Sequence, residues 1–69
     1  MTMAVTVTVN GKPREVPPGT TVAQVVETLT TVRGGIAAAV NGEVVPRRGW
    51  SRALADRDEV EVVTAVQGG

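Results

Sequence analysis

The sequence ends in two consecutive glycines, Gly68 and Gly69, which follow a valine-rich segment. Because glycine has no Cβ, a Gly-Gly end can lie extended in a narrow channel where any side chain would clash, at the cost of extra chain entropy when it is ordered. Such an end can present its carboxylate to the active site of another protein. The alternative is a terminus that is simply frayed. The first interpretation makes the Gly69 carboxylate the candidate reactive group.

The composition leaves little other chemistry to the chain. Its 69 residues include neither Cys nor His. A thiolate nucleophile, a disulfide and a cysteine metal site are therefore excluded, and the commonest general base is missing. A chain of this length also buries only one small core. We expect no intrinsic enzyme activity, no bound cofactor and no metal site.

Charge and hydropathy narrow the class of partner. Seven basic residues balance seven acidic ones, and Trp50 is the one aromatic residue in the sequence. This argues against a nucleic-acid surface built from basic charge and stacking rings. The N-terminus lacks the regions of a signal peptide, and no apolar stretch is long enough to span a bilayer. The sequence predicts a cytoplasmic protein with protein partners, and with no nucleic acid or membrane among them.

The N-terminal part of the sequence predicts a hairpin. Residues 5–9 alternate valine with threonine, as a half-buried strand does, and Asn10-Gly11 suits the two positive-φ positions of a type I′ turn. A second strand is expected over residues 12–16, at a sheet edge because Pro13 has no N–H to donate. A two-residue turn would place basic side chains on the face that the valines bury. We therefore expect a bulge or an overhanging end, and the register stays open.

A single amphipathic helix is expected next. Thr21 and Gln24 have the spacing of a capping box at a helix start. An apolar stripe at helical spacing follows: Val22, Val25, Val26 and Leu29. The stripe predicts a helix of about ten residues that packs into the core. Gly34-Gly35 is expected to form its C-cap.

The remaining segments predict three strands and a turn. The strands are expected at Ile36 to Val40, Glu43 to Val45, and Glu59 to about Val66. A second Asn-Gly pair, Asn41-Gly42, joins the first two of these strands. Between residues 47 and 58, Trp50 and Leu54 are spaced four apart, which predicts a short helical turn over one end of the core.

The order of elements predicts an α+β domain over residues 1–66, with a mixed sheet of about five strands and one main helix on one face. Residues 67–69 form a tail beyond it. Period-two alternation leaves the other sheet face open. Small, weakly charged residues fall on that face and form a candidate docking face for a partner: Thr6, Thr8, Ala37, Ala39, Val63 and Ala65. The alternative is a modest solvated patch.

Three other features have ordinary structural interpretations. A basic cluster is formed by Arg47, Arg48 and Arg52. We favour a solvated face or local ion pairing as its interpretation over partner docking. The acidic residues around Asp58 do not have the spacing of a calcium loop, and a turn beside an exposed strand face explains them better. Trp50 is interpreted as an anchor at the core edge, because no other large aromatic side chain is available to fill volume.

The element order and the terminal Gly-Gly together resemble the ubiquitin-like β-grasp superfamily of sulfur carriers. Within it, the segments VNGEVVPRRGW (residues 40–50) and LADRDEVEVVTAVQGG (residues 54–69) resemble the thiamine-biosynthesis sulfur carrier family. The Asn-Gly-Glu, Pro-Arg and Trp elements distinguish this branch from the related small subunit of molybdopterin synthase. One departure is Arg57, which stands where relatives often carry glycine. It is expected to affect local stability rather than function.

The resemblance implies a mechanism in which partners supply every catalytic group. An E1-like adenylyltransferase, using ATP and Mg²⁺, would convert the Gly69 carboxylate into an acyl-adenylate. Sulfur from a persulfide donor would then leave a thiocarboxylate on Gly69, and thiazole synthase would consume it. Gln67 and Gly68 would thread the partner's active site while the domain stays outside.

Three other functions stay open. A small subunit of molybdopterin synthase would acquire the same modification, so partner preference would have to separate the two. A ubiquitin-like protein modifier would form isopeptide adducts on lysines of other proteins. A noncovalent interaction domain would work equally well without Gly69.

Overall fold

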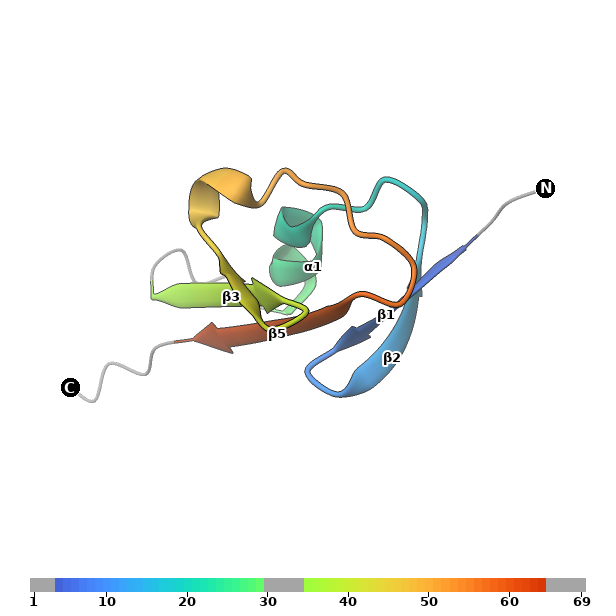
Figure 1. The fold of residues 1–69 in the computed structure, drawn as a ribbon, viewed down its shortest axis with the longest axis horizontal. Helices are drawn as coiled ribbons and strands as arrows, with labels where there is room; N and C mark the ends of the chain where they lie inside the picture. Colours follow the sequence, from blue (N-terminus) through green and yellow to red (C-terminus); the bar gives the residue numbers. More distant parts are fainter. Residues whose placement is uncertain (1–3, 30–34, 65–69) are drawn as a thin grey trace.

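The computed structural model describes residues 4–29 and 35–64. These residues contain five strands and one α-helix. The elements in chain order are β1 (Val5–Val9), β2 (Lys12–Val16), α1 (Val22–Leu29), β3 (Ile36–Val40), β4 (Glu43–Val45), the 3₁₀ helix η1 (Arg47–Gly49) and β5 (Glu59–Thr64). The strands form one sheet in the order β2-β1-β5-β3-β4, in which β1 and β5 are parallel and the other neighbours antiparallel. Helix α1 lies across one sheet face (Figure 1). The predicted α+β arrangement is confirmed.

The first hairpin has a continuous register, so of the two predicted alternatives, a bulge or an overhanging end, the bulge is wrong. Asn10 and Gly11 have φ values of 50° and 84°, and Val7 pairs with Arg14 across the two-residue turn. Strand β2 is at the sheet edge, as Pro13 predicted. An edge strand tolerates basic side chains on its inner face, because their charged ends can reach past the apolar surface. The Arg14 guanidinium does so and donates a hydrogen bond from Nη1 to Thr28 Oγ1 at 3.0 Å.

Helix α1 begins with the predicted capping box. The Gln24 N–H donates to Thr21 Oγ1 at 3.2 Å, and the Thr21 N–H donates to Gln24 Oε1 at 2.9 Å. The helix is described over 8 residues. The prediction that Leu29 is a core residue is wrong, because Leu29 is 43% exposed and is not part of the buried cluster. The predicted C-cap includes Gly34, which lies outside the described residues.

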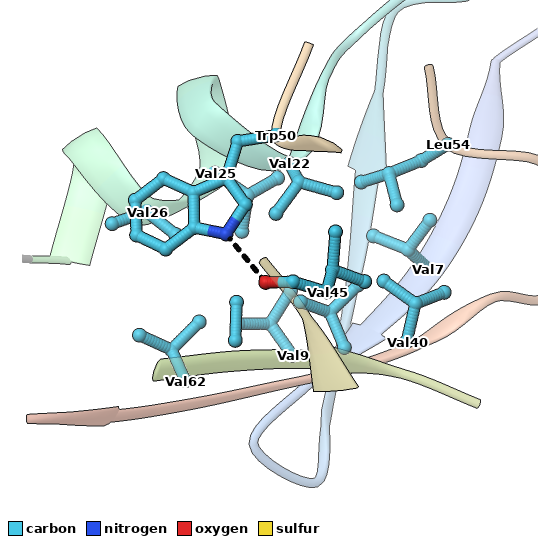
Figure 2. Packing of buried hydrophobic residues seen from close by; sticks show 12 residues of the cluster. Val7, Val9, Val22, Val25, Val26, Val40, Val45, Trp50, Leu54 and Val62 are labelled. Carbon is cyan, nitrogen blue, oxygen red and sulfur yellow. Dashed lines mark hydrogen bonds between the residues drawn. The ribbon is translucent and has the colours of Figure 1, made fainter. Parts of the chain in front are cut away.

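The core is built almost entirely from small side chains around one tryptophan. Its buried members are Val7, Val9, Val22, Val25, Val26, Ala38, Val40, Val45, Trp50, Leu54, Val60 and Val62. Each buried valine contributes roughly 1.5 kcal/mol or more by area. Figure 2 shows the indole of Trp50 against this cluster, with its Nε1–H donating to the carbonyl of Val45 at 3.0 Å. Trp50 is 8% exposed, which confirms its interpretation as a core anchor.

The short helical turn predicted between residues 47 and 58 is present as the 3₁₀ helix η1, but it does not extend to Leu54. Trp50 and Leu54 are both buried, but the 3₁₀ helix ends at Gly49 and Ala53 instead forms an isolated bridge with Thr21. The Ala23 N–H donates to the Trp50 carbonyl at 3.0 Å. The segment is therefore fixed by hydrogen bonds to the start of α1 rather than by a helix of its own.

Candidate functional site

Strand β5 leads directly to the predicted reactive end of the chain. It ends at Thr64. The predicted site residues Ala65, Gln67, Gly68 and Gly69 lie outside the described residues, as does the predicted end of the strand at Val66. The structure thus describes the strand that leads to the tail and the surface around that strand.

Strand β5 is held from three directions. On one edge it pairs with β3 over residues 60–64, and on the other it pairs with β1 at Glu59 and Val60. Val60 and Val62 point into the core, with exposed fractions of 1% and 8%. This central position gives the chain a rigid segment immediately before its C-terminal residues.

The Asn10 side chain fastens the middle of β5 on the side of β1. The Val62 N–H donates to Asn10 Oδ1 at 2.8 Å, and Asn10 Nδ2 donates to the Val62 carbonyl at 3.3 Å. The Asn10 N–H also donates to the Val60 carbonyl at 2.9 Å. The carboxamide therefore takes the place of the next peptide group of β1, because it offers one acceptor and one donor as a peptide does.

The Asn41 side chain fastens the start of β5 on the side of β3. The Glu59 N–H donates to Asn41 Oδ1 at 2.9 Å, and Asn41 Nδ2 donates to Asp58 Oδ1 at 2.9 Å. Asp58 is 7% exposed, and its Oδ2 accepts a hydrogen bond from the Ala55 N–H at 2.8 Å. The buried carboxylate thus has a partner at each oxygen. Such partners offset the cost of removing its charge from water.

Sequence reasoning assigned both asparagines a backbone role alone. Their positive φ values, 50° at Asn10 and 53° at Asn41, agree with that role. One feature of the sequence indicates the additional role of these side chains as hydrogen-bonding groups. Aspartate and asparagine both suit such turns, but only the carboxamide can donate and accept at once, and asparagine occupies both turns.

The turn before β5 contains Arg57. Its φ is 72°, in the left-handed region. The Arg57 N–H donates to the Thr6 carbonyl, with N and O 2.6 Å apart, and Asp56 Oδ1 accepts from the Thr6 N–H at 2.8 Å. This turn therefore continues the contact between β1 and the β5 segment. The Arg57–Asp56 ion pair, with Nε and Oδ2 3.9 Å apart on exposed side chains, adds little.

The predicted docking face divides into two parts. Thr6 and Thr8 lie on β1, where Thr8 pairs with Glu59 and Thr6 with Glu15. Ala37 pairs with Val63, and Ala39 pairs with Glu61. Because outward positions alternate along β5, Glu59 and Glu61 lie between the threonines and Val63. The structure therefore does not bring the threonines beside Val63.

The apolar part includes a residue that sequence reasoning missed. Val44 of β4 pairs with Ala39 and is 75% exposed, and Val63 is 62% exposed. A strand of 3 residues shows too little alternation to assign Val44 to a face in advance. We refer to the following residues as the apolar patch: Ala37, Ala39, Val44 and Val63.

The basic cluster lies apart from this face. Arg47, Arg48 and Arg52 are exposed in the segment that follows β4, and the Arg47 guanidinium carbon lies 4.9 Å from the centroid of the Trp50 ring. A cation over an aromatic face is attracted by the ring quadrupole. In residues 4–29 and 35–64, no three His, Cys, Asp or Glu side chains are grouped so as to hold a metal ion. No helix within those ranges has the length and hydropathy needed to cross a bilayer.

Fold and site together define a class: a small β-grasp domain whose central strand leads to its C-terminal residues. The ThiS family model matches residues 7–69. A solved structure, the thiamine biosynthesis protein (ThiS) from Geobacter metallireducens, matches with a TM-score of 0.70 and 30% identity, over 94% of this chain and 100% of that one. Comparison with curated proteins gave no match.

The chain belongs to the ThiS family, whose members are sulfur carriers in thiamine biosynthesis and not enzymes. This confirms the resemblance, the fold and the carrier function predicted from the sequence. Membership also implies interaction with enzymes of the thiamine pathway.

Proposed function

We propose that the chain carries sulfur as a thiocarboxylate on Gly69. The observation that carries this proposal is the extent of the family match, which includes Gly68 and Gly69. Strand β5 supports it, because its pairing to β1 and β3 gives the tail a rigid base. The carrier brings the carboxylate, and every nucleophile and base comes from a partner.

The proposed chemistry proceeds in three steps. An E1-like adenylyltransferase uses ATP and Mg²⁺, so that a Gly69 carboxylate oxygen bonds to the α-phosphorus and pyrophosphate leaves. The terminal sulfur of a partner's persulfide then attacks the carbonyl carbon and AMP leaves. Cleavage of the resulting S–S bond by a thiol yields the thiocarboxylate, from which thiazole synthase takes sulfur. ATP and Mg²⁺ belong to the activating enzyme, and we place this cycle in the cytoplasm, where ATP is supplied.

Domain and tail divide this work. We assign residues 1–66 to the domain and residues 67–69 to the tail. Three extended residues reach about 10 Å, which is enough to enter a partner's active site while the domain stays outside. Gln67 and Gly68 would line the approach, and the missing Cβ at Gly68 suits a narrow channel.

We place the docking of the partners on the open sheet face. The residues predicted for this role are Thr6, Thr8, Val63 and Ala65. The exposure of the apolar patch favours its part of the face, because Val63 is the residue immediately before the end of β5. A contiguous patch of exposed apolar side chains marks an interaction surface more often than scattered apolar side chains do.

Intact-mass analysis tests the proposal. The purified chain is incubated with ATP, Mg²⁺, the activating enzyme and a persulfide donor, and a chain without Gly69 is the control. We expect the full chain to gain the mass of one sulfur in place of one oxygen, and the control to stay unchanged. Equal function without Gly69 would instead indicate a noncovalent interaction domain.

Two further outcomes separate the other candidates. Copurification with the large subunit of molybdopterin synthase rather than with thiazole synthase would favour the molybdopterin function. Isopeptide adducts on lysines of other proteins would favour a protein modifier.

Substitution at Gly68 tests the narrow channel. Gly68→Leu is expected to abolish adenylation with little change in the unfolding temperature, because the substitution lies beyond the folded domain. Gly68→Ala is the matched control, with a smaller loss. Adenylation of Gly68→Leu at the wild-type rate would overturn the channel argument.

A further inference from the structure

The two edges of β5 are covered to different extents. On the side of β3, pairing runs without interruption from Val60 to Thr64. On the side of β1, strand pairing stops at Val60. Figure 1 shows β5 continuing past the β1–β2 hairpin toward the C-terminus. The last part of β5 therefore has a strand neighbour on one side only, among the residues that the structure describes.

The backbone groups on the uncovered edge can be identified by alternation. Successive residues of a strand direct their N–H and C=O groups to opposite neighbours. The carbonyls of Asp58 and Val60 accept hydrogen bonds from β1 and its turn. Val62 faces the same way, and the Asn10 carboxamide occupies both of its groups. Thr64 is the next residue with this orientation.

Asn10 thus marks a boundary on the edge of β5. On this side, the carbonyls of Asp58, Val60 and Val62 and the Val62 N–H each have a hydrogen-bond partner. At Thr64, within the described part of the chain, neither β1 nor the Asn10 turn reaches the strand. An uncovered strand edge presents a row of donors and acceptors that another strand can pair with.

We propose that the edge of β5 at Thr64, on the side of β1, accepts an extended strand of the protein that activates Gly69. This inference rests on the proposed function. The occupant follows from continuity, since the edge runs along the strand that leads to Gly69, and a protein that holds Gly69 must lie beside that strand. In strand addition, main-chain hydrogen bonds provide affinity and side-chain pockets provide specificity. The apolar patch, which includes the neighbouring Val63, offers the side-chain contacts on the open face.

Proline at position 64 tests the pairing. Thr64→Pro removes the N–H of residue 64, which faces the uncovered edge, and it leaves the hydrogen bonds of Val63 to β3 in place. Thr64→Val is the matched control, because it keeps the N–H and the branched shape. We expect both variants to keep the wild-type unfolding temperature within a few degrees. Thr64→Pro is expected to gain sulfur about tenfold more slowly, the effect of one lost hydrogen bond. A folded Thr64→Pro that gains sulfur at the wild-type rate would overturn the proposal.

Amide hydrogen exchange of the wild-type chain provides a measurement that needs no variant. We expect the Thr64 N–H to exchange about tenfold more slowly in complex with the activating enzyme, because it gains a partner. Unchanged exchange in the complex would overturn the proposed pairing, as would slowing that depends only on the concentration of the chain itself. A wild-type chain that binds with Thr64 slowed but gains no sulfur would refute the proposed function and keep the pairing.

Discussion

The two Asn-Gly turns have the same sequence and nearly the same backbone conformation, but their asparagine side chains have different hydrogen-bond partners. Their φ values are 50° and 84° in one turn and 53° and 84° in the other. The Asn10 side chain pairs with backbone groups of Val62, whereas the Asn41 side chain pairs with the Glu59 N–H and with the buried carboxylate of Asp58. The same turn motif therefore forms neutral hydrogen bonds in one place and takes part in a charged network in the other, depending on the groups that face it.

Asn41→Asp is expected to have the largest effect. It would set a second carboxylate at the 2.9 Å contact with Asp58, in a site where Asp58 is 7% exposed. The loss of a charge-assisted hydrogen bond and the new repulsion together should lower the free energy of unfolding by about 2–4 kcal/mol. Urea unfolding at neutral pH measures this.

A double variant provides the control for this prediction. Asn41→Asp combined with Asp58→Asn exchanges the donor and the acceptor, so that each polar group again has a partner. We expect it to recover most of the lost stability. Failure to recover would mean that the loss comes from the backbone of the turn rather than from the two carboxylates.

Asn10→Asp is expected to have a smaller effect. The carboxylate keeps the acceptor for the Val62 N–H, but it removes the donor to the Val62 carbonyl, a neutral and partly buried group. The cost should be about 1 kcal/mol, the usual value for one neutral hydrogen bond. The same urea measurement compares the two turns directly, and an equal loss at both would contradict the distinction between them.

Local sequence patterns predicted the strands and turns well, because these elements are determined by residues that are neighbours in the sequence. Alternation in β1 and the Asn-Gly pairs depend on neighbouring residues, and both hairpins follow them. The exposure of Leu29 and Val44 depends on which other elements pack against them, which no local pattern records. The division of the docking face by Glu59 and Glu61 likewise depends on strand order. Of the candidate site, the sequence therefore predicted the open face with Ala37, Ala39 and Val63, but it predicted neither Val44 nor the separation of the threonines from Val63.

Arg57→Gly offers the smallest expected effect and extends the comparison to a third left-handed position. Asn10 and Asn41 tolerate positive φ because short polar side chains suit it, whereas Arg57 is held at φ 72° with no such advantage. Glycine removes a strain of roughly 1–2 kcal/mol but makes the unfolded chain more flexible, so the net gain should be about 0.5 kcal/mol. The hydrogen bond from residue 57 to the Thr6 carbonyl is made by the backbone and is retained. Arg57→Ala is the matched control, which removes the exposed ion pair with Asp56 but keeps the strain. A gain in thermal stability shared by both variants would assign the effect to the side chain, whereas a gain confined to glycine identifies the backbone as its source.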